Sequence, residues 1–324
     1  MIKILNNKFF AFLKLVRVEN LIIVVLTQTF LHYLVFQKIF AEANIPSNIY
    51  IKLFGLIVIS TVLIAAAGYI INDYFDVKTD MINHPETVVL DKAIKRRWAI
   101  ILHISFTTLG ILLGMYTALK TGYLRLALFH ILTATALWFY STHFKKQLLI
   151  GNIVVSLLTA SVPFITFVFE IAYLQKTIPG FTVNHIPVVL AASKITLIFC
   201  LFAFITSFAR EIIKDMEDVV GDKATGGKTM PISWGIETSK AVCFFLISIT
   251  VILLLVVIYN TIKYKGELIT MPNMYILFGL VCPLITLLYM TVRANTSKQF
   301  KHASVFLKFI MLLGIGYCWI YYFS

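Results

Sequence analysis

The feature that most constrains this chain is a series of apolar runs, each of which is long enough to cross a lipid bilayer. A helix needs roughly 20 residues to span a hydrocarbon core about 30 Å thick. Hydrophobic residues make up 60% of the 324 residues and charged residues only 13%, which excludes an ordinary soluble domain. The runs lie at residues 18–40, 50–72, 98–119, 122–142, 147–171, 187–212, 240–262, 273–293 and 303–323. The sequence therefore predicts an all-α membrane protein with nine transmembrane helices.

The division between the third and fourth runs decides the topology of everything that follows it. Only Lys120, Thr121 and Gly122 supply a turn signal there, and without a turn every later helix would cross the membrane in the opposite direction. The two longest polar stretches fall within 72–97 and 210–239, and neither is long enough to be a soluble domain. We expect residues 1–324 to form a single membrane domain.

The net charge of +13 is distributed by loop rather than over one soluble face. With the N-terminus assigned to the cytoplasm, 19 of the 28 Lys and Arg residues fall on the cytoplasmic side, 7 fall on the other side, and Lys194 and Lys308 lie within apolar runs. Because cytoplasmic loops are enriched in Lys and Arg, this bias predicts an internal N-terminus and an external C-terminus. We expect a multi-pass protein of a bacterial or archaeal cytoplasmic membrane and no nucleic-acid partner.

Acidic clusters follow the second and the sixth apolar runs. Ionisable groups at the end of a span are costly unless they are paired, hydrated or holding an ion, so they indicate a functional site. Asn72, Asp76 and Asp80 recur at i, i+4 and i+8, and line one stripe if the second helix continues through them. The second cluster follows i, i+4, i+7 and i+11 with Glu211, Asp215, Asp218 and Asp222. Since the two runs are four crossings apart, both clusters end on the same side and can face one cavity.

Carboxylate and amide oxygens presented in this way suit Mg²⁺, which binds through one or two carboxylates while it shares phosphate oxygens with a substrate. A second interpretation is a pair of solvated helix ends whose acids pair with Lys78, Arg210 and Lys214. Two clusters on one side favour the metal site over this alternative.

Basic residues stand near both clusters on the side that we assign to the cytoplasm. Cations and Mg²⁺ together can hold a diphosphate and stabilise it as a leaving group. Most of these residues are equally explained as topology markers. We select Arg17, Lys145 and Lys214 because each of them adjoins a helix end rather than the centre of a loop.

Two other motifs are set aside. The segment 221–229 resembles a phosphate-binding P-loop, but an extra Gly227 separates the second glycine from Lys228, and no strand precedes it. The seven histidines have no metal-ligand spacing, so we expect them at helix interfaces or in the core.

At these residues the chain resembles the UbiA superfamily of intramembrane prenyltransferases, whose signatures are N-D-x-x-D-x-x-x-D and D-x-x-x-D. The first signature is matched by Asn72, Asp73, Asp76 and Asp80, and the second by Asp218 and Asp222, with Asp215 just upstream. The R-x-x-N of the family is matched by Arg17 and Asn20, and its Y-x-x-x-x-K by Tyr140 and Lys145, which Gly151 and Asn152 follow.

The resemblance implies a nine-helix bundle with a central cavity that opens to the cytoplasmic side. It implies a Mg²⁺ site whose ligands are Asn72, Asp76, Asp218 and Asp222, and supporting catalytic roles for Asp80 and Asp215. Contacts to the diphosphate of a polyprenyl substrate would come from Arg17, Asn20, Tyr140, Lys145 and Lys214.

Within the family, the second cluster is most similar to the digeranylgeranylglyceryl-phosphate synthase branch of ether-lipid synthesis. The chain departs from that branch after Asp80. Such sequences continue N-x-P-x-R-P, whereas 83–88 read Asn-His-Pro-Glu-Thr-Val and lack the Arg and the second Pro. The departure bears on acceptor recognition and on one phosphate contact.

We therefore expect a Mg²⁺-dependent transferase that moves a prenyl group, expected to be geranylgeranyl, from its diphosphate to a membrane-associated acceptor, geranylgeranylglyceryl phosphate. An aromatic quinone precursor or another isoprenoid is the alternative acceptor. A cation-coupled transporter is the alternative from another class, but its acids should lie near the middle of the bilayer.

Overall fold

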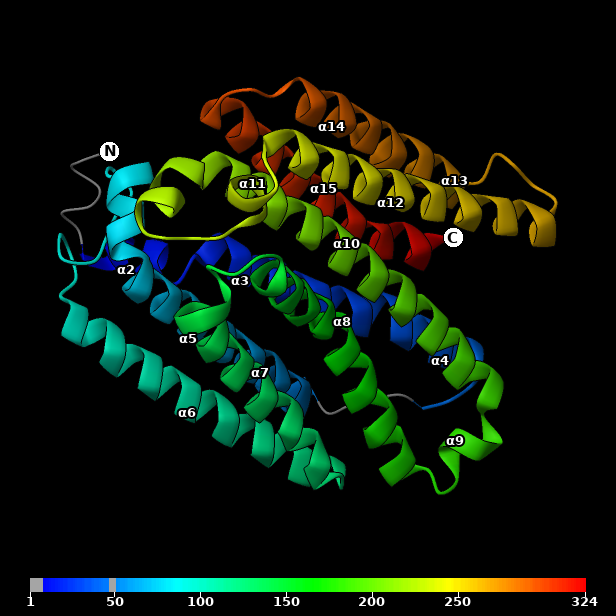
Figure 1. The fold of residues 1–324 in the computed structure, drawn as a ribbon. Coiled ribbons are helices and arrows are strands. Elements are labelled where there is room, and N and C mark those ends of the chain that lie inside the picture. The colour runs from blue at the N-terminus through cyan, green and yellow to red at the C-terminus, as the bar shows by residue number, and fades with distance from the viewer. Residues whose placement is uncertain (1–7, 47–50) are drawn as a thin grey trace.

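The computed structural model describes residues 8–46 and 51–324, which form a bundle of long helices (Figure 1). Within these two ranges, nine helical stretches are long and apolar enough to cross a membrane, which confirms the predicted fold and number of spans. The α-helices are α2 (Lys8–Leu15), α3 (Val18–Phe30), α4 (Gln37–Glu42), α5 (Ile51–Asn83), α6 (Arg96–Thr121), α7 (Ala127–Phe139), α8 (Ile150–Thr177), α9 (Phe181–Asn184), α10 (Ile186–Ala224), α11 (Met230–Ser233), α12 (Ile236–Lys265), α13 (Met271–Met274), α14 (Cys282–Arg293) and α15 (Ser297–Phe323). The π-helical segments η1 (Leu31–Phe36), η3 (Tyr140–Phe144) and η4 (Tyr275–Val281) and the 3₁₀ segment η2 (Leu124–Leu126) continue neighbouring helices.

The acidic clusters lie on helices rather than in loops. The predicted ends of the second and sixth helices, at residues 72 and 212, are too early, because α5 continues to Asn83 and α10 to Ala224. Hydropathy marks where the bilayer ends, but a helix continues as long as its backbone hydrogen bonds are satisfied. At 1.5 Å per residue the 39 residues of α10 measure about 58 Å, so its last turns extend past the hydrocarbon core.

The turn between the third and fourth spans is real. Gly122 follows α6 with a φ of 82°, which is left-handed backbone that glycine adopts without strain, and its N–H bonds back to the last turn of the helix. The sequence signal at 120–122 therefore marks a true helix end that separates the third span from the fourth.

The bundle buries its apolar residues in several clusters between helices rather than in one central core. The largest cluster lies between α10, α12, α14 and α15 and includes Ile212, Cys243, Leu284 and Leu307. The outer faces carry exposed apolar side chains, such as Leu112 on α6 and Phe245 on α12, which suits contact with lipid.

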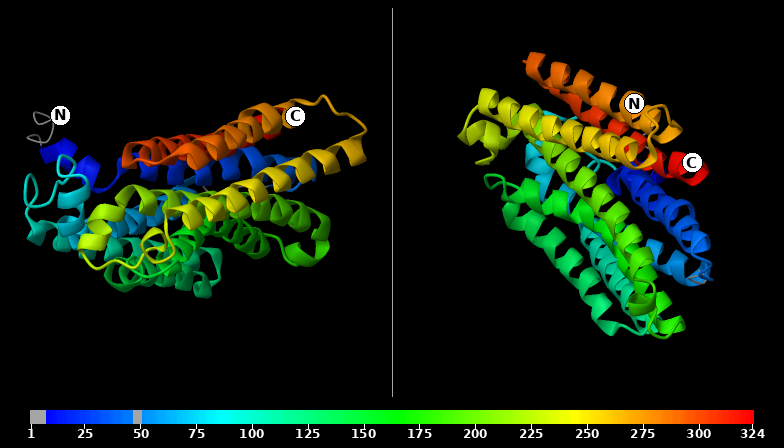
Figure 2. Two further views of the ribbon diagram at one scale, coloured as in Figure 1. Left: turned by 45° about the horizontal axis from the view of Figure 1, so that its top comes forward. Right: turned by 90° about the vertical axis from the view of Figure 1, so that its right-hand side faces the viewer.

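The segments that follow α5 and α10 lie at the same end of the bundle. Figure 2 shows the cyan segment after α5 and the yellow-green segment around α11 together at the end where α2 lies, and the C-terminus at the opposite end. This arrangement brings together two acidic helix ends that are about 140 residues apart in the chain.

A buried hydrogen bond joins two spans at the other end of the bundle. His32 in η1 pairs through Nδ1 with Glu170 in α8, and each residue is only 2% exposed. The Nε2 atom of His32 lies 3.4 Å from Nε2 of Gln37, and its ring stacks on Phe54. Because each partner satisfies the other within an apolar region, the pair connects α8 firmly to the first span.

Glu170→Ala is expected to lower the free energy of unfolding by about 3 kcal/mol, because it leaves Nδ1 of His32 buried without its partner. The matched control is Glu42→Ala, which removes a 63% exposed side chain 3.9 Å from Lys38 and should cost no more than about 0.5 kcal/mol. Equilibrium unfolding in mixed detergent micelles measures both values. Equal losses in the two variants would contradict a stabilising role for the buried pair.

Candidate active site

A cavity of about 230 Å³ opens between the helices at the end where the acidic segments meet. Its walls come from α3, α5, α7, η3, α8, α10 and α15. Of the site residues predicted from sequence, those that line it are Arg17, Asn20, Asn72, Asp80, Tyr140, Lys145, Lys214, Asp215, Asp218 and Asp222. Asp76 lies directly behind this wall, where it is 3% exposed and bonded to two of the lining residues. The structure thus brings the whole predicted set together around one space.

On α5, the carboxylate of Asp76 is held from two sides. Asn72, one helical turn earlier, donates its Nδ2 to Oδ2 of Asp76 at 2.7 Å. The ammonium group of Lys145, which follows η3, pairs with the same oxygen. The other polar atom of Asn72, Oδ1, is buried and has no hydrogen-bond partner among the described residues.

Lys145 is placed by the way its short loop packs on α8. A Cβ on Gly151 would lie only 2.8 Å from the carbonyl oxygen of Phe144, so glycine permits this close approach of loop and helix. Burial disfavours the charged form of Lys145, but Asp76, Tyr140 and Asp80 together outweigh this effect and raise the pKa of Lys145 above its ordinary value. The side chain therefore stays cationic at neutral and alkaline pH.

Arg17 occupies the junction of α2 and α3 in left-handed backbone, with a φ of 50°. Its guanidinium bonds the carboxylate of Asp73 at 2.7 Å and also faces the cavity. Burial opposes the charge on the guanidinium, whereas Asp73 favours it and raises the pKa of Arg17 above the usual value. Asp73, a signature residue for which the sequence predicts no role, thus fixes Arg17 at the cavity wall.

On α10, the acids face the same cavity and are held by residues from other helices. Asn152, at the start of α8, donates Nδ2 to Oδ2 of Asp215 at 2.7 Å. Asp222 lies one turn beyond Asp218 and also lines the cavity. Three further charged residues line the wall. Glu211 belongs to the predicted acidic stripe but is assigned no role from the sequence, which also assigns Arg210 and Lys308 no role at the cavity.

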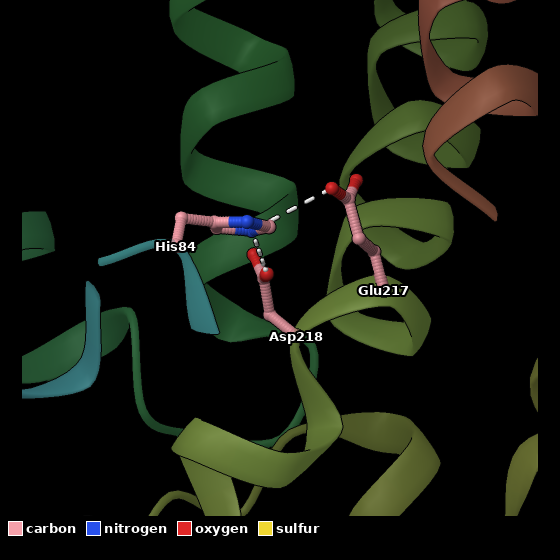
Figure 3. Close-up of side chains that lie close together, drawn as sticks. All are labelled: His84, Glu217 and Asp218. Atoms are coloured by element: carbon pink, nitrogen blue, oxygen red, sulfur yellow. Dashed lines mark hydrogen bonds and ion pairs between the residues drawn. The ribbon is translucent and has the colours of Figure 1, made fainter. Parts of the chain in front are cut away.

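The structure also reveals a contact of His84 that is not predicted from the sequence. His84, just after α5, points at α10, where its Nε2 lies 2.7 Å from Oδ1 of Asp218 and 3.5 Å from Oε1 of Glu217 (Figure 3). The hydrogen bond with Asp218 raises the pKa of His84 above its ordinary value, against the effect of burial. His84 contacts another helix, as expected, but its ligand atom also lies within 4.8 Å of those of Glu217 and Asp218, a grouping that could hold a metal ion and that the spacing of the histidines does not predict. The only signal in the sequence that relates His84 to the acidic motif is its position in the Asn-His-Pro segment that follows Asp80.

The donor atoms around the cavity fit Mg²⁺. They are carboxylate and amide oxygens, which are the hard ligands that this ion prefers. The buried Oδ1 of Asn72, directly beside Asp76, has no hydrogen-bond partner within residues 8–46 and 51–324, so a cation could bind it. Asp80, Asp218 and Asp222 present further oxygens to the same space from two helices.

Acidic clusters from two transmembrane helices, cationic side chains beside them and a cavity between the helices form a site that suits a metal ion and an anionic group. The chain belongs to the UbiA prenyltransferase family, whose model matches residues 33–315.

Known proteins similar to this chain agree with that membership. The digeranylgeranylglyceryl phosphate synthase of Methanothermobacter thermautotrophicus is 34% identical over 199 residues, which are 60% of this chain and 62% of that enzyme. A solved structure described as digeranylgeranylglyceryl phosphate synthase superposes with a TM-score of 0.60 at 24% identity, over 96% of this chain and 98% of its own. A UbiA homologue from Archaeoglobus fulgidus, bound to DMAPP and Mg²⁺, has a TM-score of 0.52 at 17% identity, over 95% and 98% of the two chains. At these identities the two structures establish the fold.

Proposed function

We propose that this chain transfers a geranylgeranyl group from its diphosphate to geranylgeranylglyceryl phosphate in a Mg²⁺-dependent reaction. The observation that carries the proposal is the meeting of both acidic helices with Arg17 and Lys145 at one cavity. The acceptor is supported by the similarity to the named synthases, including one from Methanopyrus kandleri that is 29% identical over 253 residues.

The polar end of the cavity suits a metal-bound diphosphate. In this proposal Asn72, Asp76, Asp218 and Asp222 hold Mg²⁺, and Asp80 and Asp215 lie beside them as supporting carboxylates. When bound, the ion supplies charge neutralisation and polarises the leaving diphosphate. The diphosphate oxygens are contacted by Arg17, Asn20, Tyr140, Lys145 and Lys214. Both Arg17 and Lys145 have raised pKa values, so each keeps its positive charge for an anionic substrate.

The other end of the cavity suits an isoprenoid tail. A narrow apolar space of about 60 Å³ continues from it and shares Ile23, Val162 and Met311 with the main cavity. Its further walls come from Phe199 and Phe202 on α10. An apolar tail in this space places the allylic carbon at the polar end and keeps water away from it.

The chemistry of the transfer follows from this placement. The allylic C–O bond of the donor breaks and diphosphate leaves, stabilised by the cationic side chains. The hydroxyl oxygen of the acceptor forms the new C–O bond, and its proton passes to a carboxylate of the acidic clusters. Burial of the reacting carbon among the helices protects the developing carbocation from water.

We further propose that the acidic end of the bundle faces the cytoplasm, together with the N-terminus. The support is the excess of Lys and Arg on this side, 19 against 7. A water-soluble diphosphate product is then released into the compartment where diphosphates are made and hydrolysed.

Purified protein in nanodiscs, given labelled geranylgeranyl diphosphate and geranylgeranylglyceryl phosphate, is expected to form an ether product and release diphosphate only when Mg²⁺ is present. A parallel reaction with 4-hydroxybenzoate tests the aromatic acceptor. Product with the aromatic acid alone would overturn the assignment of the acceptor. Absence of product with both acceptors, under conditions in which the protein remains folded, would overturn the transferase.

A further inference from the structure

The end of α5 is attached to α10 by a side chain that bonds main-chain atoms. Asn83, the last residue of α5, donates Nδ2 to the carbonyl oxygen of Asp218 at 3.0 Å. Its Oδ1 accepts from the backbone N–H of Gly221 at 2.7 Å. Both partners lie inside α10 rather than at its end. One carboxamide therefore holds the stretch of α10 that carries Asp218 and Asp222.

Gly221 makes this contact sterically possible. A Cβ at that position would lie 2.5 Å from Nδ2 of Asn83, a distance that real Cβ atoms do not reach. The glycine has no positive φ to explain its presence. Its lack of a side chain is instead required by the approach of Asn83.

His84 adds a bond to a side chain of the same stretch. Figure 3 shows the imidazole, on the segment after α5, reaching across to Asp218 and Glu217 on α10. A third contact joins the two helices nearby, where the hydroxyl oxygens of Thr79 and Thr225 lie 3.0 Å apart. The hydrogen bond with His84 occupies Oδ1 of Asp218, whereas Oδ2 of Asp218 has no hydrogen-bond partner among the described residues.

The two helices need such an attachment because their acids repel each other. Asp76 on α5 and Asp222 on α10 are close enough to interact unfavourably, and Asp80, Asp215 and Asp218 add charge of the same sign to the cavity. Lys145 offsets part of this repulsion, but without a bound metal ion the remaining like charges favour separation of the helix ends. Hydrogen bonds from a neutral carboxamide to backbone groups oppose the separation without altering the charge of the site.

We propose that Asn83, His84 and Gly221 form an α5–α10 clip that sets the spacing of the two acidic clusters before Mg²⁺ and the diphosphate bind. The proposal rests on the function proposed above and makes Asn83 and His84 positioning residues. Since a prearranged ligand set binds its ion more tightly, loss of the clip raises the Mg²⁺ concentration that the site requires.

The test is Asn83→Ala in the full-length protein. The Mg²⁺ concentration that half-saturates binding of inorganic pyrophosphate, measured by calorimetry, is expected to rise about 10- to 100-fold, which is the usual effect of losing a residue that orients metal ligands. At saturating Mg²⁺, turnover should return to within about threefold of the unaltered protein, because excess ion compensates for lost prearrangement.

Asn273→Ala is the matched control. Its Nδ2 also bonds main-chain oxygens, those of Leu268 at 3.2 Å and Glu267 at 3.5 Å, but at the other end of the bundle. This variant should lower the melting temperature and leave the Mg²⁺ midpoint unchanged. Equal Mg²⁺ midpoints in the Asn83 and Asn273 variants would overturn the clip.

Gly221→Ala keeps the test decisive if Asn83→Ala fails to fold. It removes no polar group and favours helix within α10, but its Cβ displaces the carboxamide of Asn83. The Mg²⁺ midpoint should rise as in Asn83→Ala, and an unchanged midpoint would overturn the clip.

If the unaltered protein binds pyrophosphate without dependence on Mg²⁺, the proposed function fails at its metal site. A Mg²⁺-dependent unaltered protein with unshifted variants contradicts the clip alone.

Discussion

Asp76→Ala is expected to reduce prenyl transfer about 1,000-fold or more while the helices remain folded. The carboxylate of Asp76 is the meeting point of Asn72 and Lys145 behind the cavity wall. Its removal takes away a proposed Mg²⁺ ligand, and it also leaves the ammonium of Lys145 without its ion-pair partner. A loss of this size corresponds to about 4 kcal/mol of transition-state stabilisation.

The comparison for this variant is Asp91→Ala, which removes an acid that lies outside the cavity. The side chain of Asp91 is 55% exposed and lies 3.3 Å from Arg96. Turnover of this control should stay within about twofold, since exposed pairs contribute little. Product formation at saturating Mg²⁺ and circular dichroism, measured on both variants, separate loss of chemistry from loss of fold. Turnover by Asp76→Ala within threefold of the unaltered enzyme would remove Asp76 from the site.

Lys145→Met is expected to lower kcat/KM for the prenyl diphosphate about 100-fold, with an increase in KM and a decrease in kcat. The ammonium group has two tasks in the proposed mechanism. It pairs with Asp76 in the free protein, and it offers positive charge to the diphosphate at the cavity wall. The pair with Asp76 contributes to substrate binding and therefore to KM. The charge offered to the diphosphate also assists departure of the leaving group and therefore contributes to kcat.

Lys223→Met provides the matched loss of one positive charge. Lys223 is exposed near the end of α10 and does not line the cavity. We expect kcat/KM to change by no more than about threefold. Steady-state kinetics over a range of diphosphate concentrations compare the two variants. Similar losses in both would show that general positive charge at this end, rather than the placement of Lys145, attracts the substrate.

Much of the fold is already determined by hydropathy. Every span crosses an apolar phase in which an uncovered polar side chain is costly, so the runs beginning near residues 18, 98 and 240 show the helices directly. The turn at Gly122 is equally local, because left-handed backbone is a property of one residue and its neighbours. The ends of α5 and α10 are not set by such a local signal. Hydropathy places both ends too early, because each helix continues beyond its apolar run.

The composition of the candidate site is also visible in the sequence. The spacing of Asp76 and Asp80, and of Asp218 and Asp222, places each pair on one helical face, and the number of crossings brings both faces to the same end. These relations depend only on helix periodicity and on the direction of each span, so the acidic residues around the cavity could be predicted from the sequence, whereas Asn20 and Tyr140 are predicted only from the family resemblance.

The partners of those residues were decided by the tertiary structure alone. That Arg17 bonds Asp73, that Lys145 bonds Asp76 and that His84 bonds Asp218 depends on how helices distant in sequence rotate and approach one another. The carboxamide of Asn83 meets the backbone of α10 only because Gly221 lies opposite it. Hydropathy and periodicity describe each helix by itself, whereas these contacts arise from packing between helices, where a shift of a single ångström makes or breaks a hydrogen bond.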